Sequence, residues 1–335
     1  MPRKNFHLAA VVLILVLLSQ TSLAASYKYK RIGEKSDAQT KPVAGIAMMG
    51  GGTDLDEAFR WLCDKADGGD FLILRARGSN DYNSYVKKLC KTNSVATLVI
   101  HDRNAAQNPA VAYIIRHAEA VFIAGGDQAL YLNFWTGTPV QDAINANIAE
   151  GKPIGGTSAG LAVLGQFAYG ALQDAPKDPD LASKDVLTDP YFKRVTVVRD
   201  FLKTPHLENT LTDSHFAKRD RMGRTLVFLA RIIHDGWSKQ PREIAIDEKS
   251  AVLVEGDGKA VVVGTGRGAY FLQPTQAPEV CQEKVPLTFK NVSAYKAPTG
   301  ARFDLPSWTG TGGVAFSLSV EQGTVRSTQA EGSPY

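Results

Sequence analysis

Residues 152–164 read KPIGGTSAGLAVL and place a serine between two glycines where a strand pattern changes into a helical one. Gly156, Ser158 and Gly160 match the pattern G-x-S-x-G, which is typical of a nucleophile elbow. The pattern requires glycines because the serine lies in a strained turn, where a Cβ atom two residues away would collide with neighbouring backbone. The stretch therefore predicts a nucleophilic Ser158 whose Oγ is exposed at the end of a strand.

An ordinary glycine-rich turn with an inert serine is the alternative interpretation, because G-x-S-x-G also occurs by chance. The short strand before the motif and the small-residue helix after it favour the elbow. In an elbow, the backbone N–H of Ala159 lies at a helix N-terminus, where it can stabilise an oxyanion.

The first half of the chain alternates between strand and helix patterns. Apolar runs typical of buried strands lie at 43–49, 71–74, 96–100 and 121–124, and helical patterns lie at 55–65, 83–89, 109–119 and 140–150. Such alternation predicts an α/β fold whose parallel sheet is covered on both faces. Glycine-rich turns at 50–54, 125–128 and 155–160 would meet at the ligand-binding edge of that sheet. None of them has the G-x-G-x-x-G or Walker pattern, so a nucleotide is not expected.

The N-terminus predicts a secretory signal peptide over residues 1–24, cleaved near Ala24 and Ala25. Arg3 and Lys4 precede an apolar run at 8–18, which is short for a membrane span; an uncleaved anchor is the alternative. Cleavage would leave a secreted or periplasmic protein without membrane contact. Its formal charge would fall from +4 to about +2, which argues against a nucleic-acid partner.

We expect a linker at 25–42, a catalytic domain at 43–272 and a C-terminal β extension with a loose tail at 273–335. Cys63 and Cys90 each end an apolar helical pattern. They form either a disulfide, if the compartment is oxidising, or two buried thiols. Cys281 has no predicted partner. No Cys/His cluster has zinc-ligand spacing, so neither a metal nor another cofactor is expected. The sequence does not define whether the protein forms a homodimer.

The second half is less regular. Residues 171–193 are rich in Asp, Pro and Lys without periodicity and predict a long surface loop. A helix is predicted over 217–233, with Met222 and Leu226 on its packed face. On that helix Arg221 and Arg224 lie away from the packed face and Arg219 lies closer to it, so spacing alone favours a solvated basic face. Short strands are predicted at 243–247, 251–255, 260–264, 270–272 and 287–294.

A nucleophilic serine needs a histidine base and an acid that orients it. After the signal peptide the histidines are His101, His117, His206, His215 and His234. His117 and His234 belong to helical patterns and are expected to be structural, His101 precedes the nucleophile in a charged turn, and His206 and His215 remain candidates. The candidate acids are Asp213, Asp247 and Glu248. Spacing does not choose among them.

Five segments, taken together, resemble the cyanophycinase branch of peptidase family S51, which also contains the aspartyl dipeptidases. In order they are GGGTD at 50–54, FIAGGDQ at 122–128, GGTSAG at 155–160, DSHF at 213–216 followed by three arginines, and IAIDE at 244–248. They lie within residues 43–265. The resemblance implies a class I glutamine amidotransferase-like fold, a three-layer α/β sandwich with a mostly parallel sheet and extra C-terminal strands.

The resemblance also implies roles for individual residues. The catalytic residues would be Ser158 as nucleophile, His215 as base and Glu248 as its acidic partner. The oxyanion donors would be the backbone N–H groups of Ala159 and of Gly125 or Gly126. The substrate pocket would include Gln128, Asp213, Ser214, Arg219, Arg221 and Arg224. Arginines there suit a substrate rich in carboxylates, which overturns the solvated-face interpretation for at least some of them.

The implied activity is that of a serine exopeptidase. Enzymes of this branch cut cyanophycin, a polyaspartate with arginine side groups, into β-Asp-Arg dipeptides through an acyl-enzyme. The family usually has Gln where this chain has Ser214, which leaves the exact substrate open and keeps other aspartyl or acidic peptides as alternatives. Two rival functions remain, an α/β-hydrolase esterase and a non-catalytic binding protein of the same fold. The esterase fold orders its triad Ser, acid, His, whereas here the best acid follows the last histidine.

Overall fold

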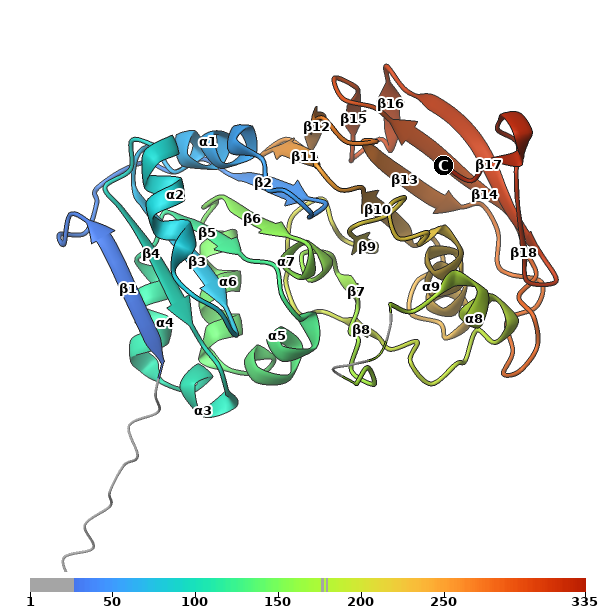
Figure 1. The fold of residues 1–335 in the computed structure, drawn as a ribbon, viewed down its shortest axis with the longest axis horizontal. Helices are drawn as coiled ribbons and strands as arrows, with labels where there is room; N and C mark the ends of the chain where they lie inside the picture. Colours follow the sequence, from blue (N-terminus) through green and yellow to red (C-terminus); the bar gives the residue numbers. More distant parts are fainter. Residues whose placement is uncertain (1–26, 176–177, 179) are drawn as a thin grey trace, which may run out of the picture.

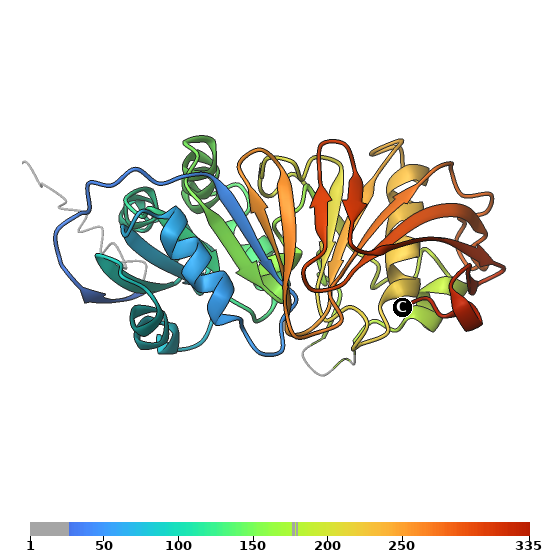
Figure 2. The ribbon, with the colours of Figure 1, turned by 90° about the horizontal axis from the view of Figure 1, so that it is seen from above.

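The computed structural model describes residues 27–175, 178 and 180–335, so the predicted signal peptide lies outside the described residues. This part of the chain forms one ten-stranded and one eight-stranded sheet, arranged along the long axis of the molecule (Figure 1). Seen from above, the helix-covered first half lies at one end and the C-terminal strands lie at the other (Figure 2). In the described ranges, no helix is long and apolar enough to cross a membrane.

Five parallel strands form the centre of the ten-stranded sheet, in the order β4-β3-β5-β6-β2. They are β2 (Gly45–Met49), β3 (Asp70–Arg75), β4 (Ser94–Val99), β5 (Ala120–Ile123) and β6 (Ile154–Thr157). Their continuous apolar runs are buried on both faces, as the sequence predicts for parallel strands between helices.

Helices cover both faces of this central part, which confirms an α/β fold. One face packs on α1 (Asp56–Lys65) and α2 (Asp81–Leu89). The other packs on α4 (Pro109–Arg116), α5 (Gln128–Trp135) and α6 (Pro139–Ala149), with the short α3 (Arg103–Ala106) beside them. Cys63 in α1 and Cys90 at the end of α2 are joined by a disulfide, one of the two alternatives predicted from sequence.

Antiparallel strands extend both edges of this sheet, so "mostly parallel" describes only its centre. On one side β1 (Lys28–Gly33) pairs with β4, which corrects the predicted linker over these residues. On the other side β11 (Ser250–Glu255), β12 (Lys259–Gly264), β15 (Arg302–Asp304) and β16 (Thr309–Thr311) follow β2.

The eight-stranded sheet has the order β18-β17-β14-β13-β10-β9-β7-β8. Its strands are β7 (Phe167–Tyr169), β8 (Val197–Arg199), β9 (Thr210–Asp213), β10 (Arg242–Ile246), β13 (Ala269–Pro274), β14 (Phe289–Ala297), β17 (Val314–Glu321) and β18 (Thr324–Ser327). One face packs on α8 (Ser183–Thr188) and α9 (Met222–His234). Residues of the opposite face, such as Ile244 and Phe271, share a core with β11 and β12.

Three further expectations need correction. Helix α8 lies within the stretch predicted to be an irregular surface loop. The tail is not loose: β18 pairs with β17, a 3-10 turn spans Ala330–Gly332, and the Tyr335 hydroxyl accepts a hydrogen bond from the Met222 N–H. Strand β13 also runs across the expected boundary at residue 272. Of the strands after it, β14, β17 and β18 continue the second sheet, whereas β15 and β16 belong to the first.

Candidate active site

Ser158 lies between β6 and the short helix α7 (Ala159–Ala162), with φ 53° and ψ −115°. This left-handed backbone is strained for a residue with a side chain. A Cβ atom on Gly160 would lie 1.9 Å from the Ile123 carbonyl oxygen, and one on Gly156 would lie 2.5 Å from the Gly160 carbonyl. The two glycines are therefore required sterically, and the turn has the geometry of a nucleophile elbow.

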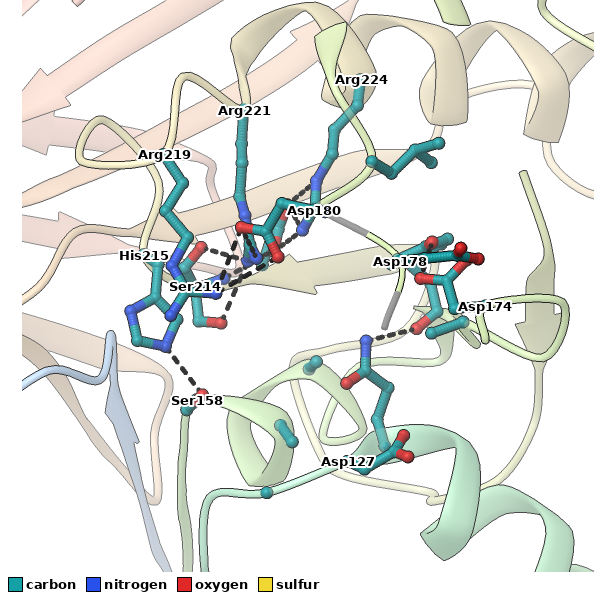
Figure 3. Close-up of a pocket in the computed structure, with 18 of the residues that line it drawn as sticks. Asp127, Ser158, Asp174, Asp178, Asp180, Ser214, His215, Arg219, Arg221 and Arg224 are labelled. Carbon is teal, nitrogen blue, oxygen red and sulfur yellow. Dashed lines mark hydrogen bonds and ion pairs between the residues drawn. The ribbon is translucent and has the colours of Figure 1, made fainter. Parts of the chain in front are cut away.

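A hydrogen-bonded chain connects Ser158, His215 and Glu248. Ser158 Oγ lies 2.8 Å from His215 Nε2 (Figure 3), and His215 Nδ1 lies 2.7 Å from Glu248 Oε1. His215 follows β9 and Glu248 follows β10, which are neighbouring parallel strands, so their ends meet beside the elbow. In this network His215 carries its proton on Nδ1, directed at Glu248, and accepts the Ser158 proton on Nε2.

The turn after β2 anchors all three members of this chain. Its successive carbonyl oxygens accept backbone hydrogen bonds from Ser158 (to Met49, 3.1 Å), His215 (to Gly50, 2.8 Å) and Lys249, the neighbour of Glu248 (to Gly51, 3.1 Å). The sequence predicted that the glycine-rich turn at 50–54 lies at the ligand-binding edge, but not that it anchors the backbone of these three residues. The signal that could have found it is the run itself, because three glycines allow other backbone to approach closely.

The electrostatic surroundings keep His215 neutral and Glu248 ionised. Burial lowers the pKa of His215, and the charges of Arg219 and Arg221 lower it further, against the opposing effect of Glu248. The hydrogen bond with His215 lowers the pKa of Glu248. A neutral imidazole beside an ionised carboxylate can take a proton from the serine and is stabilised once it carries that proton.

Backbone N–H groups beside Ser158 can donate hydrogen bonds to a negatively charged oxygen that forms there. Ala159 is the first residue of α7, so its N–H has no acceptor within the helix. The Tyr131 hydroxyl donates to the Ala124 carbonyl (2.8 Å) and also lies 3.2 Å from the Gly125 carbonyl oxygen. Because the peptide bond is planar and trans, a Gly125 carbonyl that faces Tyr131 directs the next N–H, that of Gly126, away from Tyr131. Gly126 and Ala159 line the pocket at Ser158, and Gly125 is not among its lining residues.

The pocket has a volume of about 300 Å³ and one wall of arginines. Arg224 is buried and holds Asp213 through both carboxylate oxygens, with its Nε 2.9 Å from Oδ2 and its Nη2 2.6 Å from Oδ1. Arg221 donates to Asp213 Oδ1 (3.1 Å) and to the Ser214 carbonyl (2.8 Å). Gln128 lines the pocket and its amide lies 3.4 Å from the Tyr169 carbonyl oxygen. No group of ligating side chains that could hold a metal ion occurs among the described residues.

Residues 48–262 match the family model described as peptidase family S51. The chain belongs to peptidase family S51. It is 27% identical over 216 residues to a cyanophycinase of Trichormus variabilis, covering 63% of this chain and 65% of that protein. It is 29% identical over 179 residues to a cyanophycinase of Synechococcus elongatus, covering 51% of this chain and 47% of that protein. The matches thus span less than two thirds of these relatives' lengths.

Two solved structures are also similar to this S51 chain. A peptidase from an acI-B1 actinobacterium has a TM-score of 0.48 and 20% identity, over 67% of this chain and 88% of that one. A Listeria monocytogenes protein described as a putative peptidase E has a TM-score of 0.43 and 14% identity, over 67% and 99%.

The structure distinguishes among the alternatives that spacing left open in this S51 chain. His206 Nε2 contacts the Gly256 carbonyl and not Ser158, and Asp247 accepts from the Lys218 N–H. Asp213 binds arginines rather than a histidine. His215 and Glu248 are therefore the histidine and acid that lie with Ser158.

The arginines are arranged differently from the helical-wheel expectation. Arg221 and Arg224 are buried, whereas Arg219, expected nearer the packed face, has 40% of its side chain exposed. The physical reason is that α9 begins only at Met222, so Arg219 lies in a preceding turn where helical spacing does not apply. Sequence reasoning also missed the aspartates at 174, 178 and 180, which line the pocket from the stretch predicted to be a loop. Only its acidic composition pointed to them.

Proposed function

We propose that this protein is a secreted or periplasmic serine exopeptidase that hydrolyses cyanophycin to β-Asp-Arg dipeptides. The observation that carries the proposal is the hydrogen-bonded order Ser158, His215, Glu248 at a nucleophile elbow. Two relatives of this S51 chain bear the name cyanophycinase, and that name motivates the choice of substrate.

Acylation begins when Ser158 Oγ attacks the scissile carbonyl and His215 Nε2 takes the hydroxyl proton. The N–H groups of Ala159 and Gly126 stabilise the oxyanion, each donor contributing about 3 kcal/mol to the transition state. His215 then gives its proton to the leaving amine, whose departure breaks the peptide bond. In the second half, water loses a proton to His215 and attacks the acyl-enzyme, which releases the acid and restores Ser158.

The charges of the pocket support a substrate that carries both carboxylates and guanidinium groups. Arg219, Arg221 and Arg224 face the pocket from one side, and Figure 3 shows Asp127, Asp174 and Asp178 on the side away from them. Arginines bind carboxylates with two parallel hydrogen bonds, and carboxylates bind guanidinium groups in the same way. A branched polymer of aspartate and arginine presents both partners.

The location outside the cytoplasm rests on two features. The basic residues and apolar run at the N-terminus have the pattern of a secretory signal. The Cys63–Cys90 disulfide, with Cα atoms 6.0 Å apart, is of the kind that persists in oxidising compartments. The amidotransferase-like classification of the fold belongs to the same proposal and rests on the helix-covered parallel strands.

The test is incubation of the protein lacking residues 1–24, as wild type and as Ser158→Ala, with purified cyanophycin. We expect the wild type alone to release β-Asp-Arg, identified by mass. Turnover by a correctly folded Ser158→Ala variant would refute the nucleophile. Cleavage of a β-aspartyl or acidic dipeptide panel, with the polymer left intact, would keep the serine mechanism and change the substrate.

The same proteins separate the rival functions. Preference for simple aryl esters over acidic peptides would indicate an esterase, although the chain order Ser158, His215, Glu248 argues against the α/β-hydrolase arrangement. Failure of Ser158 to react with a fluorophosphonate would indicate a binding protein that does not catalyse hydrolysis.

A further inference from the structure

Among the described residues, two carboxylates form ion pairs with the arginine wall, which consists of Arg219, Arg221 and Arg224, and they differ in burial. Asp213, on β9, has 3% of its side chain exposed and is held by Arg224 and Arg221. Asp180 has 45% of its side chain exposed and is held by Arg221 and Arg219. A buried ion pair leaves an uncompensated charge when it is broken, whereas a half-exposed carboxylate can exchange its partner for water or for another anion. Asp213 is thus a fixed part of the wall, and Asp180 is displaceable.

The contacts of Asp180 are those that a bound carboxylate would make. Both of its oxygens lie near Arg219 Nη1, at 3.3 Å and 3.2 Å, and Oδ2 also lies 3.1 Å from Arg221 Nη2. Arg219 is the most exposed of the three arginines, and all of these groups line the pocket that contains Ser158 (Figure 3). Asp180 therefore lies where an acidic ligand would reach the arginines.

Asp180 comes from the connection between β7 and α8, not from the framework of the wall. Before it, Asp174 accepts from Arg194 Nε (2.7 Å) and from the Tyr169 hydroxyl (2.9 Å). After it, the Ser183 hydroxyl donates to the Asp220 carbonyl (2.5 Å). Among the described residues, the hydrogen bonds of the Asp180 carboxylate all come from Arg219 and Arg221. Its position thus depends on the same two guanidinium groups that a substrate needs.

We propose that Asp180 is a specificity-determining residue that occupies, in the free pocket, the place of a substrate carboxylate on Arg219 and Arg221. The inference rests on the proposed function, because it takes these arginines to bind an acidic substrate. A tethered competitor has an effective concentration on the order of millimolar. A ligand with one carboxylate competes poorly with it, whereas a ligand with several adjacent carboxylates can displace Asp180 and keep further contacts. The pocket therefore selects polyacidic chains over simple acids.

The test measures the binding of a fluorescein-labelled tetra-aspartate peptide by anisotropy. Ser158→Ala serves as the reference protein, so that no peptide is consumed, and Asp180→Asn is added to it. The matched control is Asp185→Asn, which removes one negative charge from an exposed site on α8, five residues away. We expect Asp180→Asn to lower the Kd about fivefold and the control to change it less than about twofold. The affinity of acetate, a competitor with one carboxylate, should rise by a larger factor on Asp180→Asn than the affinity of the tetra-aspartate does.

Unchanged or weaker peptide binding by Asp180→Asn, with an unchanged Tm, would overturn the inference. Weaker peptide binding by Asp180→Asn would mean that Asp180 attracts the positively charged groups of a ligand. A peptide that binds none of the three proteins would also overturn it, because the arginines would then not accept carboxylates. Hydrolysis and fluorophosphonate labelling of the Ser158 protein test the proposed function separately. Tighter binding without any hydrolysis would leave this inference standing and reject the function.

Discussion

Gly51 lies so close to His215 that a Cβ atom at Gly51 would be 2.6 Å from both Cε1 and Nε2 of the imidazole. The same atom would be 3.1 Å from the Cβ atom of Ser158. The glycine has φ +91°, and its carbonyl accepts the Lys249 N–H at 3.1 Å. The turn after β2 thus supports the imidazole from one side while leaving no room there for a side chain.

Replacing Gly51 by Ala should displace the imidazole and reduce kcat about 100-fold, because misplacement by about 1 Å costs that much. KM should change little, since Gly51 is not part of the arginine wall. The matched control is Gly300→Ala, which has a similar φ of +86° but no atom within 4 Å of the added Cβ. Both variants carry the same kind of backbone strain, so only Gly51→Ala should slow labelling by a fluorophosphonate. Equal losses of activity in the two variants would show that strain alone is responsible.

The rate of fluorophosphonate labelling should rise with pH through an apparent pKa below the ordinary histidine value of about 6.5. The sign follows because only neutral His215 can accept the Ser158 proton, and burial lowers the pKa of His215. Arg219 contributes to that lowering through its positive charge. Arg219→Gln should therefore raise the apparent pKa, so that the labelling rate rises at higher pH than in the wild type. An apparent pKa that is unchanged or lower in Arg219→Gln would contradict the assignment of this titration to His215.

The elbow and the five central strands could be predicted because their signals are local. Gly156 and Gly160 are required by atoms within the turn or on the adjacent strand, and a buried parallel strand is apolar along its whole length. Strand β1 gives no such signal. Its sequence KYKRIG is polar and largely exposed, and it is a strand only because β4 offers an unpaired edge about 65 residues later in the chain.

The arrangement of the site could be predicted only in part, for a similar reason. A helical wheel assumes one continuous helix, but the arginines 219, 221 and 224 straddle the start of α9, so their directions depend on the preceding turn. The contact between Asp180 and Arg219 joins residues 39 positions apart. Neither periodicity nor motif spacing contains that information. The contact depends on the path of the intervening chain, which includes β8 and β9, and on how α8 packs on the second sheet.

Removal of the Cys63–Cys90 disulfide should lower the free energy of unfolding by about 3 kcal/mol, since it closes a segment with a sequence separation of 27. The double variant Cys63→Ser/Cys90→Ser should lose stability in urea denaturation while keeping its kcat, because α1 and α2 lie outside the pocket. Cys281 is buried and should contribute no cross-link. Non-reducing peptide mapping checks the pairing; two alkylated thiols at these positions would favour the alternative of free cysteines.

Glu243, fully buried on β10, should make the wild type less stable as the pH rises. Burial, and then the charge of Asp213, raises the pKa of Glu243 well above its ordinary value, and its Oε2 has no partner among the described residues. Above about pH 4.5 the folded protein then binds more protons than the unfolded chain. The free energy of unfolding therefore falls, by up to about 1.4 kcal/mol per pH unit, until the folded carboxyl ionises.

Glu243→Gln removes this titration and can still accept the hydrogen bond that Thr225 donates at 2.8 Å. Between pH 5 and pH 8, the free energy of unfolding in urea should therefore decline more steeply for the wild type than for the variant. Glu57→Gln, at an exposed position on α1, is the matched control and should follow the wild type. Parallel pH profiles for the wild type and Glu243→Gln would mean that the buried carboxyl is ionised in the folded protein, with Arg224 compensating its charge.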